Sequence, residues 1–190
     1  MVESRRDSLI DAAAELLDRG GPAAVTLRDV GRAAGVSHNA PYKHFADKDD
    51  LLAAVAAREL ERQQAEAAPA NGASQPTPRA LMEGYVRWAR RYPERFRLTF
   101  GRWTRDNPGL GEAAAGARAM MIEAVVRAQG AGDLPAGNPE RLAVLVLALA
   151  HGAADLALAG HLSATGRGRA DPEGLLADLF GYLKAAAVAG

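Results

Sequence analysis

Apolar residues recur at helical spacing at the start of the chain, with acidic residues between them. The apolar positions are Leu9, Ile10, Ala13, Leu16 and Leu17. Residues three or four apart share one face of a helix, so this pattern predicts an amphipathic first helix with a buried stripe. The Gly20-Gly21-Pro22 sequence that follows is expected to end it, because glycine and proline both disfavour a helix interior.

Two short helices separated by a glycine turn are predicted next. Thr26 stands as an N-cap with an acid, Asp29, after it, and Gly35 is a typical helix end. Ser37 then caps a third helix, expected over residues 38–45. A helix, a turn and a second helix of this size form the unit that presents one helix to a DNA groove.

The rest of the chain also has helical periodicity. A longer fourth helix is expected to begin at about Asp47, and the polar, proline-rich segment 68–78 interrupts the pattern. Further helices are predicted over residues 81–91, from Pro93, and over 110–129, 140–162 and 172–187. Strand-like alternation is absent, so the predicted fold class is all-α. We expect an N-terminal module at 1–50, a connecting helix and linker at 51–77, and a second domain at 78–190.

Composition and charge exclude several classes of protein and give no indication of DNA binding. The 190 residues carry 23 basic and 23 acidic side chains, so the net charge of +0 gives no sign of a nucleic-acid binder. The absence of cysteine excludes disulfides and thiolate chemistry. The N-terminus lacks the apolar core of a signal peptide, and the most apolar run, 142–150, is too short to cross a bilayer. We expect a cytoplasmic protein without membrane association.

Residues 37–45 carry the side-chain types that contact DNA. On a helix wheel Pro41 and Phe45 share the side that packs onto the first two helices, and Asn39 and Lys43 lie away from it. Asparagine pairs with adenine, lysine with guanine or phosphate, and tyrosine and histidine with phosphate oxygens. The segment is therefore a candidate reader, and the alternative is an ordinary solvated helix face.

The run TLRDVGRAAGVSHNAPYKHFADKDDLL, residues 26–52, resembles the helix-turn-helix signature of the TetR/AcrR family of bacterial transcriptional regulators. The resemblance implies a three-helix DNA-binding module, followed by a helical ligand-binding and dimerisation domain. It also implies repression at a palindromic double-stranded DNA operator, relieved by a small molecule. The base contacts that it implies come from Arg28, His38, Asn39 and Lys43. The phosphate contacts come from Thr26, Tyr42, His44 and Lys48, and the reader also includes Ser37 and Ala40.

The second half resembles regulators whose C-terminal domain bears a Trp-x-x-x-His-Gly signature. The similarity lies in YPERFRLTFGRW, residues 92–103, and LALAHGAADLALAGHL, residues 147–162. His151-Gly152 is present, but Leu147 stands where the tryptophan is expected, which leaves the ligand unassigned. We expect a small hydrophobic effector oriented by a hydrogen bond to His151. The predicted ligand-binding residues are Trp88, Phe96, Phe100, Trp103, Met121, Leu147 and His151.

Other chemistries have weaker support. His151 and Asp155 have a spacing that can hold a metal, but without a further ligand the expectation is a hydrogen-bonded core histidine and no metal. Nucleophile elbows, phosphate-binding loops and zinc helices are absent, so we expect no catalytic residues, no cofactor and no enzyme. The alternative function is an all-α small-molecule-binding protein or enzyme whose N-terminal module does not bind DNA.

A homodimer is the expected assembly. One reading helix contacts few base pairs, and helix-turn-helix proteins gain specificity by pairing onto two half-sites. The helices expected at 140–162 and 172–187 are rich in apolar residues, and the family resemblance implies that they form a four-helix interface. The segment from Pro93 and residues 60–66 are the expected coupling elements between effector and reader.

Overall fold

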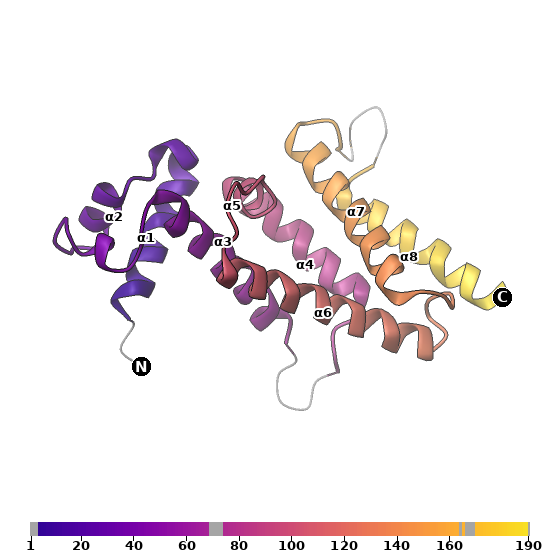
Figure 1. Ribbon diagram of the computed structural model, residues 1–190. Coiled ribbons are helices and arrows are strands. Elements are labelled where there is room, and N and C mark those ends of the chain that lie inside the picture. The colour runs from indigo at the N-terminus through magenta and orange to yellow at the C-terminus, as the bar shows by residue number, and fades with distance from the viewer. Residues whose placement is uncertain (1–3, 69–73, 164, 166–169, 190) are drawn as a thin grey trace. The chain divides into compact units, whose positions relative to one another are not determined.

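The computed structural model describes residues 4–68, 74–163, 165 and 170–189, and these residues are helical apart from short turns and one isolated bridge between Ser163 and Ala170 (Figure 1). The predicted all-α fold is confirmed. The chain forms two compact units, which are described separately. Unit 1 comprises Met1–Arg62 and Tyr92–Ala115, and unit 2 comprises Gln63–Arg91 and Gly116–Gly190. Residues 69–73 of the predicted proline-rich break lie outside the described residues.

Unit 1 contains the N-terminal helices and a later helix. They are α1 (Arg5–Gly20), α2 (Leu27–Ala33), the first part of α3 (Lys48–Ala67), α5 (Pro93–Thr99) and the start of α6 (Pro108–Gly130). The apolar stripe predicted for α1 is buried except for Leu16, which is partly buried, and Leu9 and Leu17 pack in one core with Val30, Phe45 and Val55. The first helix ends as predicted, because Gly21 has a φ of 65° and its N–H bonds to the Leu17 carbonyl at 2.7 Å.

Unit 2 is a bundle of helices. It contains α4 (Pro78–Arg91), the rest of α6, α7 (Pro139–Leu158) and α8 (Pro172–Ala189). Helix α4 packs against both α7 and α8, which also contact each other (Figure 1). The side of α7 that faces the bundle is rich in alanine, which allows neighbouring helices to approach closely. Its buried alanines are Ala143, Ala150, Ala153 and Ala154.

Helix α7 is more apolar than its burial requires. Asn138 caps it by accepting the Arg141 N–H at 2.9 Å, and Pro139 begins it. The 142–150 run alone is too short to cross a membrane, but the whole 20-residue helix is long and apolar enough to do so. Only 28% of its most apolar stretch is buried. Length and composition do not separate a membrane span from a helix of a protein core or interface.

Candidate nucleic-acid interface

Helix α2 supports the reader and is closed at both ends by local hydrogen bonds. The Thr26 hydroxyl accepts the Asp29 N–H at 3.1 Å, and it donates to the Asp29 carboxylate at 2.6 Å. At the other end Gly35 has a φ of 67°, its N–H bonds to the Arg32 carbonyl at 3.2 Å, and the Val36 N–H bonds to the Gly31 carbonyl at 2.9 Å. This pair of bonds is the Schellman motif, which turns the chain from α2 into the reader.

The reader itself is not the α-helix predicted over residues 38–45, and that prediction is wrong in form. The segment is a turn followed by a short 3₁₀ helix, η2 (Pro41–Lys43). The Ala40 N–H bonds to the Ser37 carbonyl at 2.9 Å, and the His44 N–H bonds to the Pro41 carbonyl at 3.0 Å, each spanning three residues. Pro41 explains the difference, because it has no N–H to donate to Ser37 and its ring crowds that carbonyl in an α-helix.

The inner side of the reader is buried against the module core. Pro41 lies so close to α2 that a Cβ at Gly31 would stand 3.1 Å from its Cγ. Phe45 is part of the core, and the guanidinium carbon of Arg6 lies 5.3 Å from the centre of its ring. Ala40, which the family resemblance places among the DNA-binding residues, is buried. The packing therefore holds the reader in a single position on the unit.

The outer side of the reader is polar and open to solvent. The exposed candidates for DNA contact are Thr26, Arg28, Ser37, His38, Asn39, Tyr42, Lys43 and His44. Tyr42 is 58% exposed, which is unusual for an aromatic side chain and places its hydroxyl within reach of a partner. Thr26 and Arg28 lie at the start of α2, and the other six candidates lie along the reader, where they offer donors for base edges and phosphates.

The start of α3 provides the remaining candidate, half-buried Lys48. Asp47 caps this helix by accepting the Asp50 N–H at 2.9 Å, and the Asp50 carboxylate accepts the Ala46 N–H at 3.0 Å. The hydrogen bond from the Asp50 amide lowers the pKa of Asp47, and Arg105 lowers it further against the opposing effect of desolvation. The caps fix the start of α3, and the Lys48 ammonium is the candidate for a phosphate contact there.

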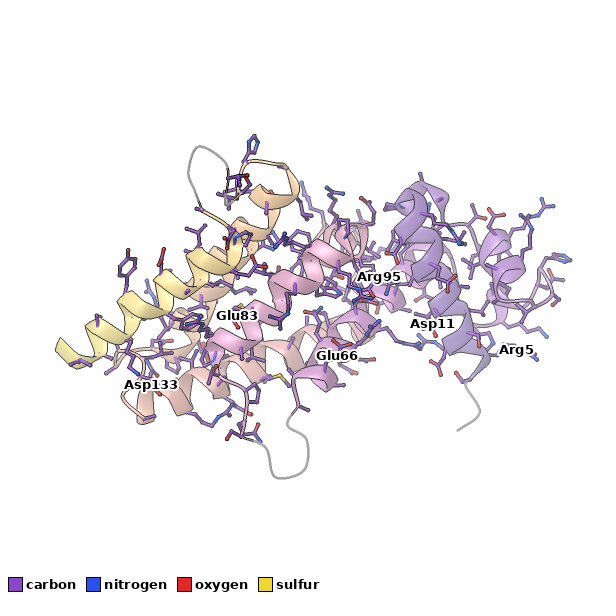
Figure 2. The ribbon with its side chains drawn as sticks, turned by 180° about the vertical axis from the view of Figure 1, so that it is seen from behind. Arg5, Asp11, Glu66, Glu83, Arg95 and Asp133 are labelled. Atoms are coloured by element: carbon purple, nitrogen blue, oxygen red, sulfur yellow. The ribbon has the colours of Figure 1, made fainter. Side chains whose placement is uncertain are left out.

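A buried ion cluster in unit 1 was not predicted from the sequence. Figure 2 marks the position of Arg95 of α5. Its guanidinium donates to Glu59 of α3 at 2.8 Å and to Asp18 of α1 at 2.5 Å, and it lies over the Tyr92 ring at 4.4 Å from the ring centre. Burial lowers the pKa of Arg95, but Asp18 and Glu59 outweigh it and raise the pKa overall. In the sequence, Glu59 on the buried side of α3 could have indicated such a cluster, but its partner Arg95 lies 36 residues away. The cluster joins α5 to α1 and α3 of the same unit.

The predicted ligand-binding residues fall in both units. Trp88, Met121, Leu147 and His151 belong to unit 2, and Phe96, Phe100 and Trp103 belong to unit 1. In unit 2 the Tyr85 hydroxyl lies 2.8 Å from His151 Nδ1, and its ring centre is 6.2 Å from that of Trp88. Burial raises the pKa of Tyr85, so the phenol stays protonated. Tyr85 was missing from the predicted site, although it lies one helical turn before Trp88.

His151 and Asp155, whose spacing could suit a metal, differ in their surroundings. Asp155 is exposed, whereas His151 is half-buried and paired with Tyr85. Among the described residues no three potential metal ligands come together. The interaction of His151 with Tyr85 is the hydrogen bond expected of a core histidine.

An all-helical chain with a helix-turn-helix module and an exposed polar reader defines a DNA-binding transcriptional regulator. Residues 9–55 match the model for "Bacterial regulatory proteins, tetR family", and residues 79–180 match "Tetracyclin repressor-like, C-terminal domain". The chain belongs to the TetR family, and the family predicted from residues 26–52 is confirmed.

Similar proteins agree with this assignment. The HTH-type transcriptional repressor Rv3405c of Mycobacterium tuberculosis is 29% identical over 128 residues, which cover 61% of this chain and 68% of that protein. A solved protein of unknown function from Rhodococcus sp. RHA1 is 30% identical, with a TM-score of 0.73 and coverage of 96% and 94% of the two chains. FadR of Bacillus subtilis, solved with stearoyl-CoA, shares the fold at a TM-score of 0.65 and 14% identity, with coverage of 94% and 97%.

Proposed function

We propose that this regulator is a cytoplasmic repressor that binds a palindromic operator as a homodimer and is released by a small hydrophobic effector. The observation that carries the proposal is the reader, whose inner side is packed at Gly31 and Pro41 while its outer side exposes Asn39, Tyr42 and Lys43. A rigid support with solvated donors is the arrangement that base and phosphate recognition requires. In this proposal residues 1–50 bind DNA, 51–77 connect, and 78–190 bind effector and partner, with no catalytic role.

The surface of α7 and α8 supports the dimer. Leu145 is 65% exposed and Tyr182 is 73% exposed, and Val144 and Leu156 are also open to solvent. Leu145 and Leu156 are eleven residues apart, about three helical turns, so they share one face of α7. Apolar residues gathered on one face of a helix are typical of a protein interface. A second copy of the same two helices would bury this face by two-fold symmetry.

The Tyr85–His151 pair supports the effector site. A buried phenol and a half-buried imidazole lie 2.8 Å apart, and the ring of Trp88 lies beside that of Tyr85. Two hydrogen-bonding groups beside an aromatic ring suit an apolar molecule with one or two polar groups. FadR of Bacillus subtilis, which has a similar fold, was solved in complex with stearoyl-CoA, and this is in line with the proposed hydrophobic effector. Trp88, Met121, Leu147 and His151 remain the predicted members in unit 2, and Phe96, Phe100 and Trp103 those in unit 1.

The test begins with selection of operator sequences from random double-stranded DNA. The protein should enrich a palindrome whose half-sites lie about one helical turn or a multiple apart. Fluorescence anisotropy should then give a binding constant of micromolar or tighter that weakens steeply as salt rises. Enrichment of no sequence, together with salt-independent binding, would support the alternative of a helical small-molecule-binding protein that does not act on DNA.

A further inference from the structure

Unit 1 contains a cavity of about 340 Å³ between the first turns of α3 and the loop of residues 101–107. All the lining residues belong to this unit, so the cavity is separate from the Tyr85–His151 pair in unit 2. Its volume is in the range of small-molecule sites. Leu52, Leu98 and Trp103 contribute apolar lining, and Asp49, Arg102 and Asp106 contribute charged lining.

Hydrogen bonds hold the two walls of the cavity together. Arg105 donates to Asp47 at 2.7 Å, and the Asn107 amide donates to Asp50 at 3.4 Å. Asn107 also caps α6, because its side-chain oxygen Oδ1 accepts the Leu110 N–H at 3.0 Å. The N-cap of α6 is therefore linked to the first turn of α3 through side chains. Hydrogen bonds that fix the walls before a ligand binds lower the cost of binding.

Trp103 lines the cavity, and its indole N–H is not accessible there. The indole packs partly buried against the core of unit 1, and its Nε1 is fully buried without a hydrogen-bond partner among the described residues. A ligand in the cavity cannot reach a nitrogen that solvent cannot reach, so the accessible part of the side chain is carbon. An indole ring attracts apolar groups and, over its face, organic cations.

The charged residues that line the cavity determine which ligand charge it favours. Asp47 and Arg105 neutralise each other as an ion pair. Asp49, Asp50 and Asp106 then outnumber Arg102, which leaves an excess of negative charge around the apolar lining. We propose that this cavity is a second ligand site, which takes a small organic cation with an aromatic or alkyl body. The proposal goes beyond the effector site, because it assigns Trp103, one of the residues predicted for that site, to a separate cavity within unit 1.

Three probes with one body and different ends test the proposal on the full chain: 4-phenylbutylamine, 4-phenylbutanol and 4-phenylbutyrate. The sequence has two tryptophans, so a Trp88→Phe variant reports Trp103 fluorescence alone. The amine should change this fluorescence in a saturable manner and bind at least about tenfold more tightly than the alcohol, and the acid should bind least. Equal binding of amine and alcohol, or no saturable binding of the amine, would overturn the proposal.

Substitutions then locate the site. Asp49→Asn combined with Asp106→Asn should weaken binding of 4-phenylbutylamine about tenfold, because two of the excess carboxylates are removed. Glu112→Gln is the matched control, since Glu112 is an exposed acid of the same unit that does not line the cavity. An unchanged unfolding midpoint establishes that the variants are folded. If the control lost as much affinity as the double variant, general surface charge would explain the binding and the cavity would not be its site.

Discussion

The guanidinium of Arg95 donates a hydrogen bond to the Glu59 carboxylate across 2.8 Å, and the two residues are only 8% and 3% exposed. This pair joins α5 to α3. The removal of both charges from water opposes this stabilisation. A charge in such a place is stable only while its partner remains, because an isolated buried ion has lost its hydration. Asp18, which bonds to the same guanidinium, brings α1 into the cluster.

Arg95→Met should lower the free energy of unfolding by about 3 to 5 kcal/mol, because it removes the guanidinium that bonds to the buried Glu59 carboxylate and to Asp18. Urea denaturation of the full chain measures the change. Arg97→Met is the control on the same helix: Arg97 pairs with Glu94 at the surface, so the loss should be within about 1 kcal/mol. Similar losses for the two variants would show that the Arg95 cluster contributes no more than a surface pair.

Gly31→Ala should weaken operator binding about tenfold while changing stability by less than about 1 kcal/mol. The new methyl group would stand 3.1 Å from the rigid Pro41 ring, so the reader must move by a few tenths of an ångström. The higher helix propensity of alanine offsets part of the strain. Gly111→Ala, where a Cβ meets nothing within 4 Å, is the control and should leave operator affinity unchanged. Anisotropy with the selected operator gives the affinities, and unchanged binding by Gly31→Ala would argue against this contact.

Asn39→Ala should cost about 1 to 3 kcal/mol on the best operator and relax the preference at one base position. Lys48→Ala should instead weaken binding to all sequences and reduce the salt slope by about 1. The measurement is a salt titration against the operator and against a scrambled duplex. Arg118→Ala, an exposed change in unit 2, controls for the loss of one positive charge. An Asn39 variant with full affinity and selectivity would remove Asn39 from the base-reading set.

Leu145→Arg should convert the dimer to a folded monomer, because it places a charge on the exposed apolar face of α7. Sedimentation velocity at micromolar concentration distinguishes the two states. Val126→Arg is the matched control, since Val126 is 50% exposed on α6, outside the proposed interface. A monomeric parent protein, or a control that dissociates equally, would contradict the assignment of α7 to the interface.

Stability should fall as pH rises above the ordinary pKa of tyrosine, and Tyr85 should be responsible. Burial raises the folded-state pKa of Tyr85, so above about pH 10 the unfolded chain releases this proton and the folded chain retains it. The folded state then loses about 1.4 kcal/mol per pH unit from this group relative to its value below pH 10. Urea denaturation at pH 9 and 11 measures the fall in parent and Tyr85→Phe proteins. The variant should fall less steeply, and equal slopes would show that Tyr85 ionises normally.

The local signals along the chain were sufficient to predict the helices, because helical periodicity and capping depend on residues only three or four positions apart. Thr26 and Gly35 act as the expected cap and stop of α2, and the helix beginning at Pro93 is present as α5. The family followed from one continuous run, residues 26–52, so it needed no knowledge of the tertiary structure. The reader departs from its predicted form because Pro41 removes the amide that an α-helix would use.

The sequence alone determined the all-α class, the order of the longer helices and the family. Only the tertiary structure decided which polar side chains are buried together: Arg95 meets Asp18 and Glu59 across separations of 77 and 36 residues, and Tyr85 meets His151 across 66. It also decided that Trp103 lines a cavity in unit 1 while His151 belongs to unit 2. These pairings depend on how whole helices pack, and the spacing of residues along one helix carries no information about which distant side chain fills the space beside it.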